Sequence, residues 1–198
     1  MKLKSVLIFL LSYLIARELL RDSYSNKYML AILDGSGGNA ALIVTAQDKR
    51  ILINGGQNFD VDASISSVIP FWGLRCRLDL IILTSPRADF VVGLNRLIKR
   101  CEVGLILFNE PARSFLEWDL WKKNTAGFNV SKVLSSKAFA FGNLRLLVTP
   151  LAKTITTTLE YGSLKVQFAN NKDILNFFEH AKIATGIIGE SGVIFAIF

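Results

Sequence analysis

The sequence predicts an α/β fold in which two β-sheets pack face to face and helices lie outside them. The order of the apolar runs is one reason. A group of short strands comes first, strands alternating with helices follow, and a second group of strands comes last. The run 78–84 is a second reason, because it is apolar on both faces, as expected of a central strand buried between two layers. The chain has 198 residues, 51% hydrophobic and 20% charged, which fits one domain with a large core and excludes a disordered chain.

The first predicted strands form an antiparallel meander. Short apolar runs at 29–33, 40–45 and 50–53 are separated by turn residues, after a polar stretch at 22–27. A helix is predicted over 64–72, and Pro70 should bend or end it.

Strands and helices alternate in the middle of the chain. The run 78–84 predicts a strand, and helical spacing of apolar residues predicts a helix over 91–99. A strand at 104–108 and a helix at 114–123 repeat this order. The remaining predicted elements are strands at 144–148, 155–161, 164–168 and 192–198, and a helix at 174–180 that Asp173 can cap.

Residues 1–22 are predicted to be a signal anchor or a signal peptide. Lys2 and Lys4 precede an uncharged apolar run at 5–16, which is the pattern of an export signal. The run is shorter than the roughly 20 residues that cross a bilayer, but a poor cleavage site around Ala16 favours an uncleaved hydrophobic helix. The alternative is a buried amphipathic helix of the domain. The basic end should stay inside, so we expect residues 23–198 to form a membrane-anchored domain on the outer, extracytoplasmic face.

The basic balance of the chain is compatible with two kinds of partner. There are 23 Lys and Arg against 16 Asp and Glu, a formal charge of +7. Nucleic acid and an anionic membrane surface both attract such a charge through their phosphate groups. A basic surface that serves only solubility is the alternative.

The two cysteines, Cys76 and Cys101, do not have the spacing of zinc ligands. Each comes shortly before a predicted strand, so a disulfide is geometrically feasible if the two strands are parallel neighbours. We expect two buried free thiols, because cysteine is among the most commonly buried residue types. The disulfide remains open as the alternative.

Five segments share their residue types and spacing with a known family. They are Asp34-Gly-Ser-Gly-Gly-Asn-Ala40, Ile51-Leu-Ile-Asn-Gly-Gly56, Leu78-Asp79, Thr84-Ser-Pro-Arg-Ala-Asp-Phe-Val-Val-Gly-Leu94 and Leu159-Glu-Tyr-Gly-Ser-Leu-Lys-Val-Gln-Phe-Ala-Asn-Asn171. Over roughly 28–171 the chain resembles the metallo-β-lactamase-like domain of the competence protein ComEC, the channel protein of bacterial DNA uptake. The resemblance implies a metallo-β-lactamase-like αββα sandwich. Because the sequence stops soon after Asn171, we expect a truncated second half with an edge or apolar face that a partner, a dimer or the bilayer covers.

The resemblance also identifies the positions at which that family holds its metal ions, and most of them have changed. Ser85 and Arg87 stand at the first two ligand positions and Phe90 at the last, so that Asp89 alone is kept. Asn171 stands where a bridging Asp is expected. A guanidinium cannot coordinate a cation, and a phenyl ring offers no lone pair. We therefore expect no catalytic metal, no catalytic residues and no cofactor.

Other polar residues at these segments are candidates for ligand binding. Asp34, Asn39 and Asn54 match second-layer or turn positions, and Arg87 adds a positive charge at the old site. The glycines at 35, 37 and 38 either bind an anion through backbone N–H groups or only allow a tight turn, which we favour. The sole histidine, His180, is expected to be a packed or surface residue. Trp118 and Trp121 are expected in the core; stacking on bases or a membrane interface is the alternative.

These observations predict a pseudoenzyme rather than an enzyme. We expect a non-catalytic, membrane-tethered binding or scaffold module, linked by the resemblance to DNA uptake, with DNA or a membrane channel protein as partner. One alternative is a hydrolase or phosphodiesterase, such as a nuclease, with a rearranged metal site that uses Asp89, Asp34 or His180. Another is a structural subunit of a membrane assembly. The oligomeric state stays open.

Overall fold

A computed structural model describes residues 11–13, 28–33, 40–56, 61–69, 76–162, 164–168 and 193–197, and these residues form two sheets and three longer helices. The larger sheet has the strand order β11-β1-β2-β3-β4-β5-β6. Its strands are β1 Met29–Leu33, β2 Ala41–Val44, β3 Arg50–Ile53, β4 Arg77–Ile82, β5 Glu102–Phe108, β6 Val130–Lys132 and β11 Val193–Ile197. The smaller sheet, in the order β10-β9-β8-β7, contains β7 Lys137–Phe141, β8 Leu144–Leu151, β9 Thr154–Tyr161 and β10 Leu164–Phe168. The helices are α2 Val61–Val68, α3 Ala88–Leu97 and α4 Leu116–Thr125.

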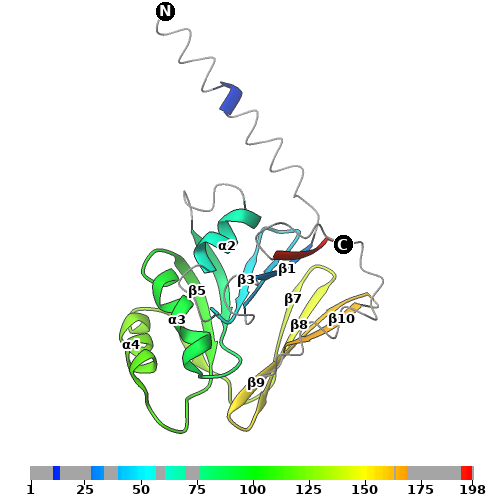
Figure 1. The fold of residues 1–198 in the computed structure, drawn as a ribbon. Helices are drawn as coiled ribbons and strands as arrows, with labels where there is room; N and C mark the ends of the chain where they lie inside the picture. Colours follow the sequence, from blue (N-terminus) through cyan, green and yellow to red (C-terminus); the bar gives the residue numbers. More distant parts are fainter. Residues whose placement is uncertain are drawn as a thin grey trace, which may run out of the picture.

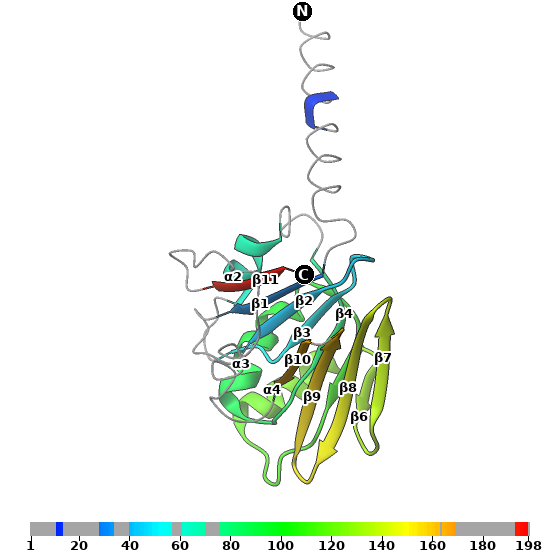
Figure 2. The same cartoon turned by 90° about the vertical axis from the view of Figure 1, so that its right-hand side faces the viewer.

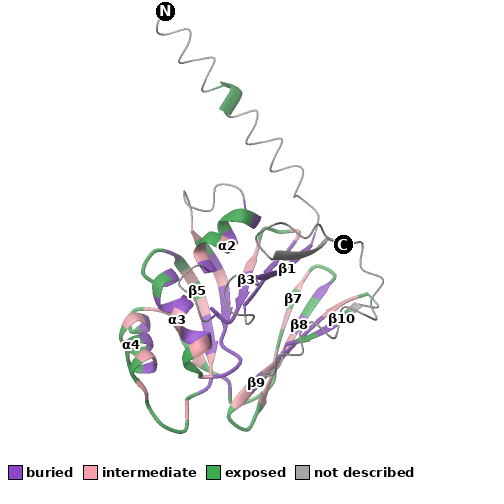
Figure 3. Ribbon diagram, in the orientation of Figure 1, coloured by how far each residue is buried: buried purple, intermediate pink, exposed green. Residues whose placement is uncertain are grey.

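The sheets and helices form layers around two cores. Figure 1 shows the three helices along one face of the larger sheet and the smaller sheet on the other. Successive side chains of a strand point to opposite faces of the sheet, so each strand contributes residues to both cores. Leu52 and Ile81 belong to the core beneath the helices, and Ile51 and Leu80 belong to the core between the sheets. The central strands are buried on both faces (Figure 3). The predicted packing of two sheets, with helices outside the larger one, is therefore confirmed. Among the described residues no helix covers the outer face of the smaller sheet, so the second helix layer of the predicted αββα sandwich is not seen there.

The parallel strands of the larger sheet all end at one edge, which we call the functional edge. Strands β3, β4, β5 and β6 pair in parallel, whereas β1 is antiparallel to both β2 and β11. The carboxyl ends of the parallel strands therefore meet at one edge of the larger sheet. The loops that follow β3, β4 and β5 all begin there, as in other open α/β sheets that carry sites at this edge.

Several elements match the predicted ranges, and the differences have local reasons. Helix α2 begins at Val61, three residues before the predicted start, with Val61, Ile65 and Val68 buried at helical spacing. The predicted strand at 192–198 corresponds to β11, but β11 pairs with β1 in the larger sheet instead of joining the second group of strands. Figure 2 shows β11 beside β1 and the face of the smaller sheet.

Strands β6 and β7 were not predicted. Strand β6 has only three residues and an exposed, polar pattern. Strand β7 carried a readable signal, because Phe139 and Phe141 alternate with alanines and Gly142-Asn143 forms a tight turn into β8. Gly142 adopts a φ of 59°, a conformation that glycine allows without strain.

The cysteine prediction was wrong. Cys76 and Cys101 form a disulfide, with their Cα atoms 4.6 Å apart. They stand directly before the parallel neighbours β4 and β5, and the N–H of Glu102 donates to the carbonyl of Cys76 at 2.9 Å. The strand register thus brings the two sulfurs together at the amino edge of the sheet, opposite the functional edge. Burial propensity, which favoured free thiols, cannot detect such a juxtaposition.

The predicted anchor lies outside the described residues except for a short helical stretch at 11–13. Within the parts of the chain that can be placed, no helix is both long enough and apolar enough to cross a bilayer. The predicted helix at 174–180 also falls outside them.

Candidate functional site

The candidate site is the segment 84–90, which links β4 to α3 at the functional edge. Its first residue, Thr84, is fully buried and bonds to Asn54 at the end of β3. The backbone N–H of Thr84 donates to Asn54 Oδ1 at 2.8 Å, and Asn54 Nδ2 donates to Thr84 Oγ1 at 2.9 Å. This reciprocal pair satisfies both buried polar side chains and fixes where the segment starts.

Asn54 holds the segment rather than facing outward as a ligand. It is 3% exposed and adopts a φ of 58°, which asparagine tolerates better than most residues. Its backbone N–H donates to the carbonyl of Ile82, and the next N–H, from Gly55, donates to the carbonyl of Phe90, both at 2.9 Å. The loop after β3 is therefore tied to both ends of the segment. These contacts agree with the turn position expected for Asn54, and they occupy both its amide oxygen and its amide nitrogen.

Arg87 and Asp89 form a two-point ion pair at the positions where the sequence resemblance expects metal ligands. Arg87 Nε donates to Asp89 Oδ1 at 2.9 Å, and Arg87 Nη2 donates to Asp89 Oδ2 at 2.7 Å. The guanidinium also lies over the ring of Phe90, 5.3 Å from its centroid. Phe90 itself is buried, so its ring packs into the core beneath the helices.

In this arrangement the cation beside Asp89 is supplied by the chain itself. Both carboxylate oxygens of Asp89 accept a charged N–H, which is the geometry in which arginine pairs most strongly with a carboxylate. The side chain of Arg87 is 52% exposed, so the pair lies at the protein surface. Two of its five N–H groups are used by Asp89, which leaves three for a ligand. Ser85, the remaining ligand position of this segment, is buried. Among the described residues, no three His, Cys, Asp or Glu side chains cluster closely enough to hold a metal ion.

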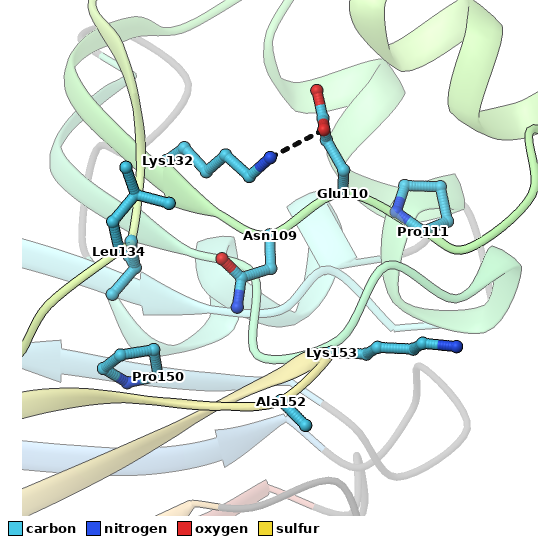
Figure 4. Close-up of a pocket in the computed structure, with 9 residues that line it drawn as sticks. Asn109, Glu110, Pro111, Lys132, Leu134, Pro150, Ala152 and Lys153 are labelled. Atoms are coloured by element: carbon cyan, nitrogen blue, oxygen red, sulfur yellow. Dashed lines mark hydrogen bonds and ion pairs between the residues drawn. The ribbon is translucent and has the colours of Figure 1, made fainter.

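A pocket beside this segment was not foreseen from the sequence. It lies where β5 and β6 end and where β8 turns into β9, and it is lined by Asn109, Glu110, Lys132, Leu134 and Lys153, among others (Figure 4). Asn109 Nδ2 donates to the carbonyl of Thr154 at 3.1 Å. No sequence signal marks this pocket, because its residues come from loops far apart in the chain.

The hairpin of β8 and β9 connects the pocket to the segment 84–90. The N–H of Ile155 donates to the carbonyl of Thr84 at 2.6 Å, next to the Thr154 carbonyl that Asn109 contacts. The segment and the pocket are therefore neighbours on the same edge. No residue of the segment lines the pocket.

The other candidate residues divide into two groups. Asp34, Asn39, Asn171 and His180, with the glycines at 35, 37 and 38, lie outside the described residues. Trp118 and Trp121 are 2% and 1% exposed and belong to the core beneath the helices. Their expected packing role is confirmed, and a surface role in base stacking is excluded by this burial.

Comparison with known proteins gives structural likenesses only. No protein-family model matches the sequence, and no curated protein matches it. The fold is similar to a metallo-β-lactamase from Cronobacter sakazakii carrying a HARLDQ motif mutation, with 14% identity and a TM-score of 0.48 over 68% of this chain and 58% of that one. It is similar to the Rm3 metallo-β-lactamase, with 15% identity and a TM-score of 0.49 over 72% and 57% of the two chains. It is also similar to Zn²⁺-bound PqqB from Methylobacterium extorquens, with 14% identity and a TM-score of 0.49 over 71% and 61%.

The chain spans about three-fifths of the length of each of these three proteins. Likenesses at this level carry no argument about the residues of the site or about activity. What they add to the two-sheet architecture is that metallo-β-lactamases are among its structural neighbours.

Proposed function

We propose that the chain is a non-catalytic pseudoenzyme of the ComEC-like metallo-β-lactamase type, tethered to the membrane and acting as a binding or scaffold module near DNA uptake. The observation that carries this proposal is the ion pair of Arg87 with Asp89. The one acidic residue kept at the expected ligand positions has both oxygens occupied by an arginine two residues before it. A metal ion would have to displace that arginine to use Asp89.

A binding role is supported by the part of the Arg87 guanidinium that Asp89 does not use. It is half-exposed, lies over the ring of Phe90, and keeps three N–H groups that Asp89 does not use. A planar guanidinium held in this way suits a phosphate group of a nucleic acid. The chain has 23 Lys and Arg against 16 Asp and Glu, and this basic balance also favours a nucleic acid as partner.

The disulfide supports the extracytoplasmic part of the proposal. Disulfides persist in oxidising compartments and are rare in the cytosol of most organisms. The bridge of Cys76 and Cys101 is therefore consistent with export of the domain, which the basic and apolar start of the sequence also favours.

The absence of metal chemistry is tested on the purified full chain in detergent. After incubation with Zn²⁺ or Mn²⁺ and removal of free metal, we expect no stoichiometric metal and no hydrolysis of a chromogenic phosphodiester. The double variant Ser85→His with Arg87→Asp puts donors back beside Asp89 and removes its internal partner, so it should bind more zinc than the natural chain. Stoichiometric metal with turnover in the natural chain would instead establish the alternative, a hydrolase with a rearranged site.

DNA binding is tested separately with single-stranded and double-stranded oligonucleotides at two salt concentrations. We expect binding that weakens as salt rises, because each released phosphate counterion contributes to affinity. Arg87→Gln should weaken it more than Arg96→Gln, which removes the same charge from an exposed position on α3. No DNA binding, or equal effects of the two variants, would remove DNA as the partner and leave a protein-assembly role.

A further inference from the structure

The pocket at the carboxyl ends of β5 and β6 has the size of a small-molecule site. Its volume is about 360 Å³, within the range that ligand pockets occupy. Three segments line this open pocket: the loop 109–111 after β5, residues 132–134 at the end of β6, and the turn between β8 and β9. Val133 is buried, and Asn109 ties the first segment to the third through its bond to Thr154. The lining segments are thus held by packing and by a side-chain hydrogen bond.

Charged groups on the rim give the pocket a positive balance. Lys132 Nζ donates to Glu110 at 2.7 Å, and this bond lowers the pKa of Glu110, which therefore stays ionised. That pair is neutral as a whole. Lys153 has no ion-pair partner within the described part of the chain. The rim accordingly carries one uncompensated positive charge, and a second becomes accessible when a stronger anion draws Lys132 from Glu110.

One side of the pocket has apolar side chains, and Lys132 lies beside them. In Figure 4, Leu134 and Pro150 lie on one side and Lys153 on the other, with Asn109 between them. Leu134 is 78% exposed, which is unusual for a leucine at the mouth of a pocket. An apolar ligand body would cover it and gain about 25 cal/mol for each Å² removed from water.

We infer that this pocket binds an organic phosphate about the size of one nucleotide. Its phosphate pairs with Lys153 and Lys132, and its apolar or aromatic body packs against Leu134 and Pro150. Lysine holds a phosphate as a compact point charge. A neutral ligand would leave the lysine charge unused, and a bare anion would leave the apolar wall exposed. The inference goes beyond the proposed function, because no lining residue belongs to the segment 84–90.

The test is calorimetric titration of the full chain in detergent with three probes. Thymidine monophosphate carries both features, thymidine carries only the body, and inorganic phosphate carries only the charge. We expect thymidine monophosphate to bind more tightly than either of the other two. A short thymidine oligonucleotide shows whether the same phosphate chemistry is recognised within single-stranded DNA.

Variants connect the binding to the named side chains. The double variant Lys132→Gln with Lys153→Gln should weaken thymidine monophosphate binding about tenfold, which corresponds to the loss of charge-assisted hydrogen bonds. Leu134→Ser should weaken it about fivefold through lost apolar contact. Lys99→Gln is the matched control, because this exposed lysine follows α3 near the amino edge of the sheet.

The inference would be overturned if thymidine or inorganic phosphate bound as tightly as thymidine monophosphate. It would also be overturned if the lysine double variant bound thymidine monophosphate as tightly as the Lys99→Gln control. Failure of all three probes to bind would do the same. If DNA binding that depends on Arg87 persists in that case, the proposed function stands without this pocket.

Discussion

At the scale of single residues, Asp79 shows how the amino edge of the sheet is held. Its carboxylate accepts the backbone N–H of Arg50 at 3.1 Å, Lys49 Nζ at 3.0 Å and Arg77 Nη2 at 2.7 Å. Burial of the carboxyl raises its pKa, but the three donors outweigh this effect and lower the pKa below its ordinary value. Asp79 therefore links the start of β3 to β4 through a charged acceptor.

Asp79→Asn should lower the free energy of unfolding by about 1–2 kcal/mol at pH 7, because the charged acceptor is lost. The native pKa lies below the unfolded value, so this stabilisation is complete above the unfolded pKa and disappears as pH falls through the native pKa. The difference between the two proteins should thus shrink below about pH 4. Urea unfolding at pH 7, 5 and 3.5 measures it.

The control for this prediction is Asp48→Asn, which removes the same charge from a side chain that is 73% exposed. It should change stability by less than about 0.5 kcal/mol. A difference for Asp79→Asn that is the same at pH 3.5 as at pH 7 would contradict the role given to the carboxylate.

The sequence could locate candidate residues but not their partners. The resemblance placed Ser85, Arg87 and Phe90 at expected ligand positions and Asn54 at a second-layer or turn position. It could not indicate that Asn54 bonds to Thr84, 30 residues away, because that contact depends on the parallel pairing of β3 and β4. The pairing of Arg87 with Asp89 is local, and it is open to sequence reasoning because charged residues of opposite sign stand two positions apart.

At the scale of elements, Gly55 allows α3 to approach the loop after β3. A Cβ atom at this position would lie 2.5 Å from Leu94 Cγ and 2.6 Å from the backbone nitrogen of Leu94. Since backbone cannot yield as a flexible side chain does, α3 would have to shift. The glycine thus sets how closely the helix that follows the candidate site packs on the sheet.

Gly55→Ala should lower the free energy of unfolding by about 1–3 kcal/mol, the usual cost of overpacking. Gly127→Ala is the matched control, because a Cβ there would meet no atom within 4 Å. It should be neutral or slightly stabilising, since alanine restricts the unfolded chain. Thermal unfolding of both variants compares them, and equal stability would show that α3 adjusts without cost.

Elements whose apolar residues follow a clear strand or helix pattern were predictable from the sequence. Elements with a weak apolar pattern were not. Strand β4 and helix α3 have continuous or helical apolar patterns that tertiary packing then uses directly. Helix α2 extends farther toward its amino end than its composition suggests, with Ser66 Oγ bonded back to the carbonyl of Asp62 at 2.7 Å. Serine hydroxyls that bond within a helix make it hard to read its start from sequence.

At the scale of the whole molecule, the disulfide closes the unit of β4, α3 and β5. It joins residues 25 positions apart, and the loop that it closes contains the candidate site and the helix that packs on Gly55. In the unfolded chain such a cross-link removes loop entropy, and a loop of this length contributes about 3 kcal/mol. The same bridge is relevant to the proposed location of the protein, because disulfides persist mainly in oxidising compartments.

Reduction of the disulfide, or the variant Cys76→Ser with Cys101→Ser, should therefore lower the midpoint of thermal unfolding by roughly 10 °C. The fold should survive, because the two cysteines form only a small part of the core beneath the helices and no part of the core between the sheets. In intact producing cells, a membrane-permeable alkylating reagent should leave both cysteines unmodified until a reductant is added. The cytosol keeps thiols reduced, so alkylation without reductant would mean that the bridge does not form where the protein resides, and the support for an extracytoplasmic domain would be lost. If the variant unfolds at the same temperature as the natural chain, the bridge contributes no stability, and only its redox state remains informative about compartment.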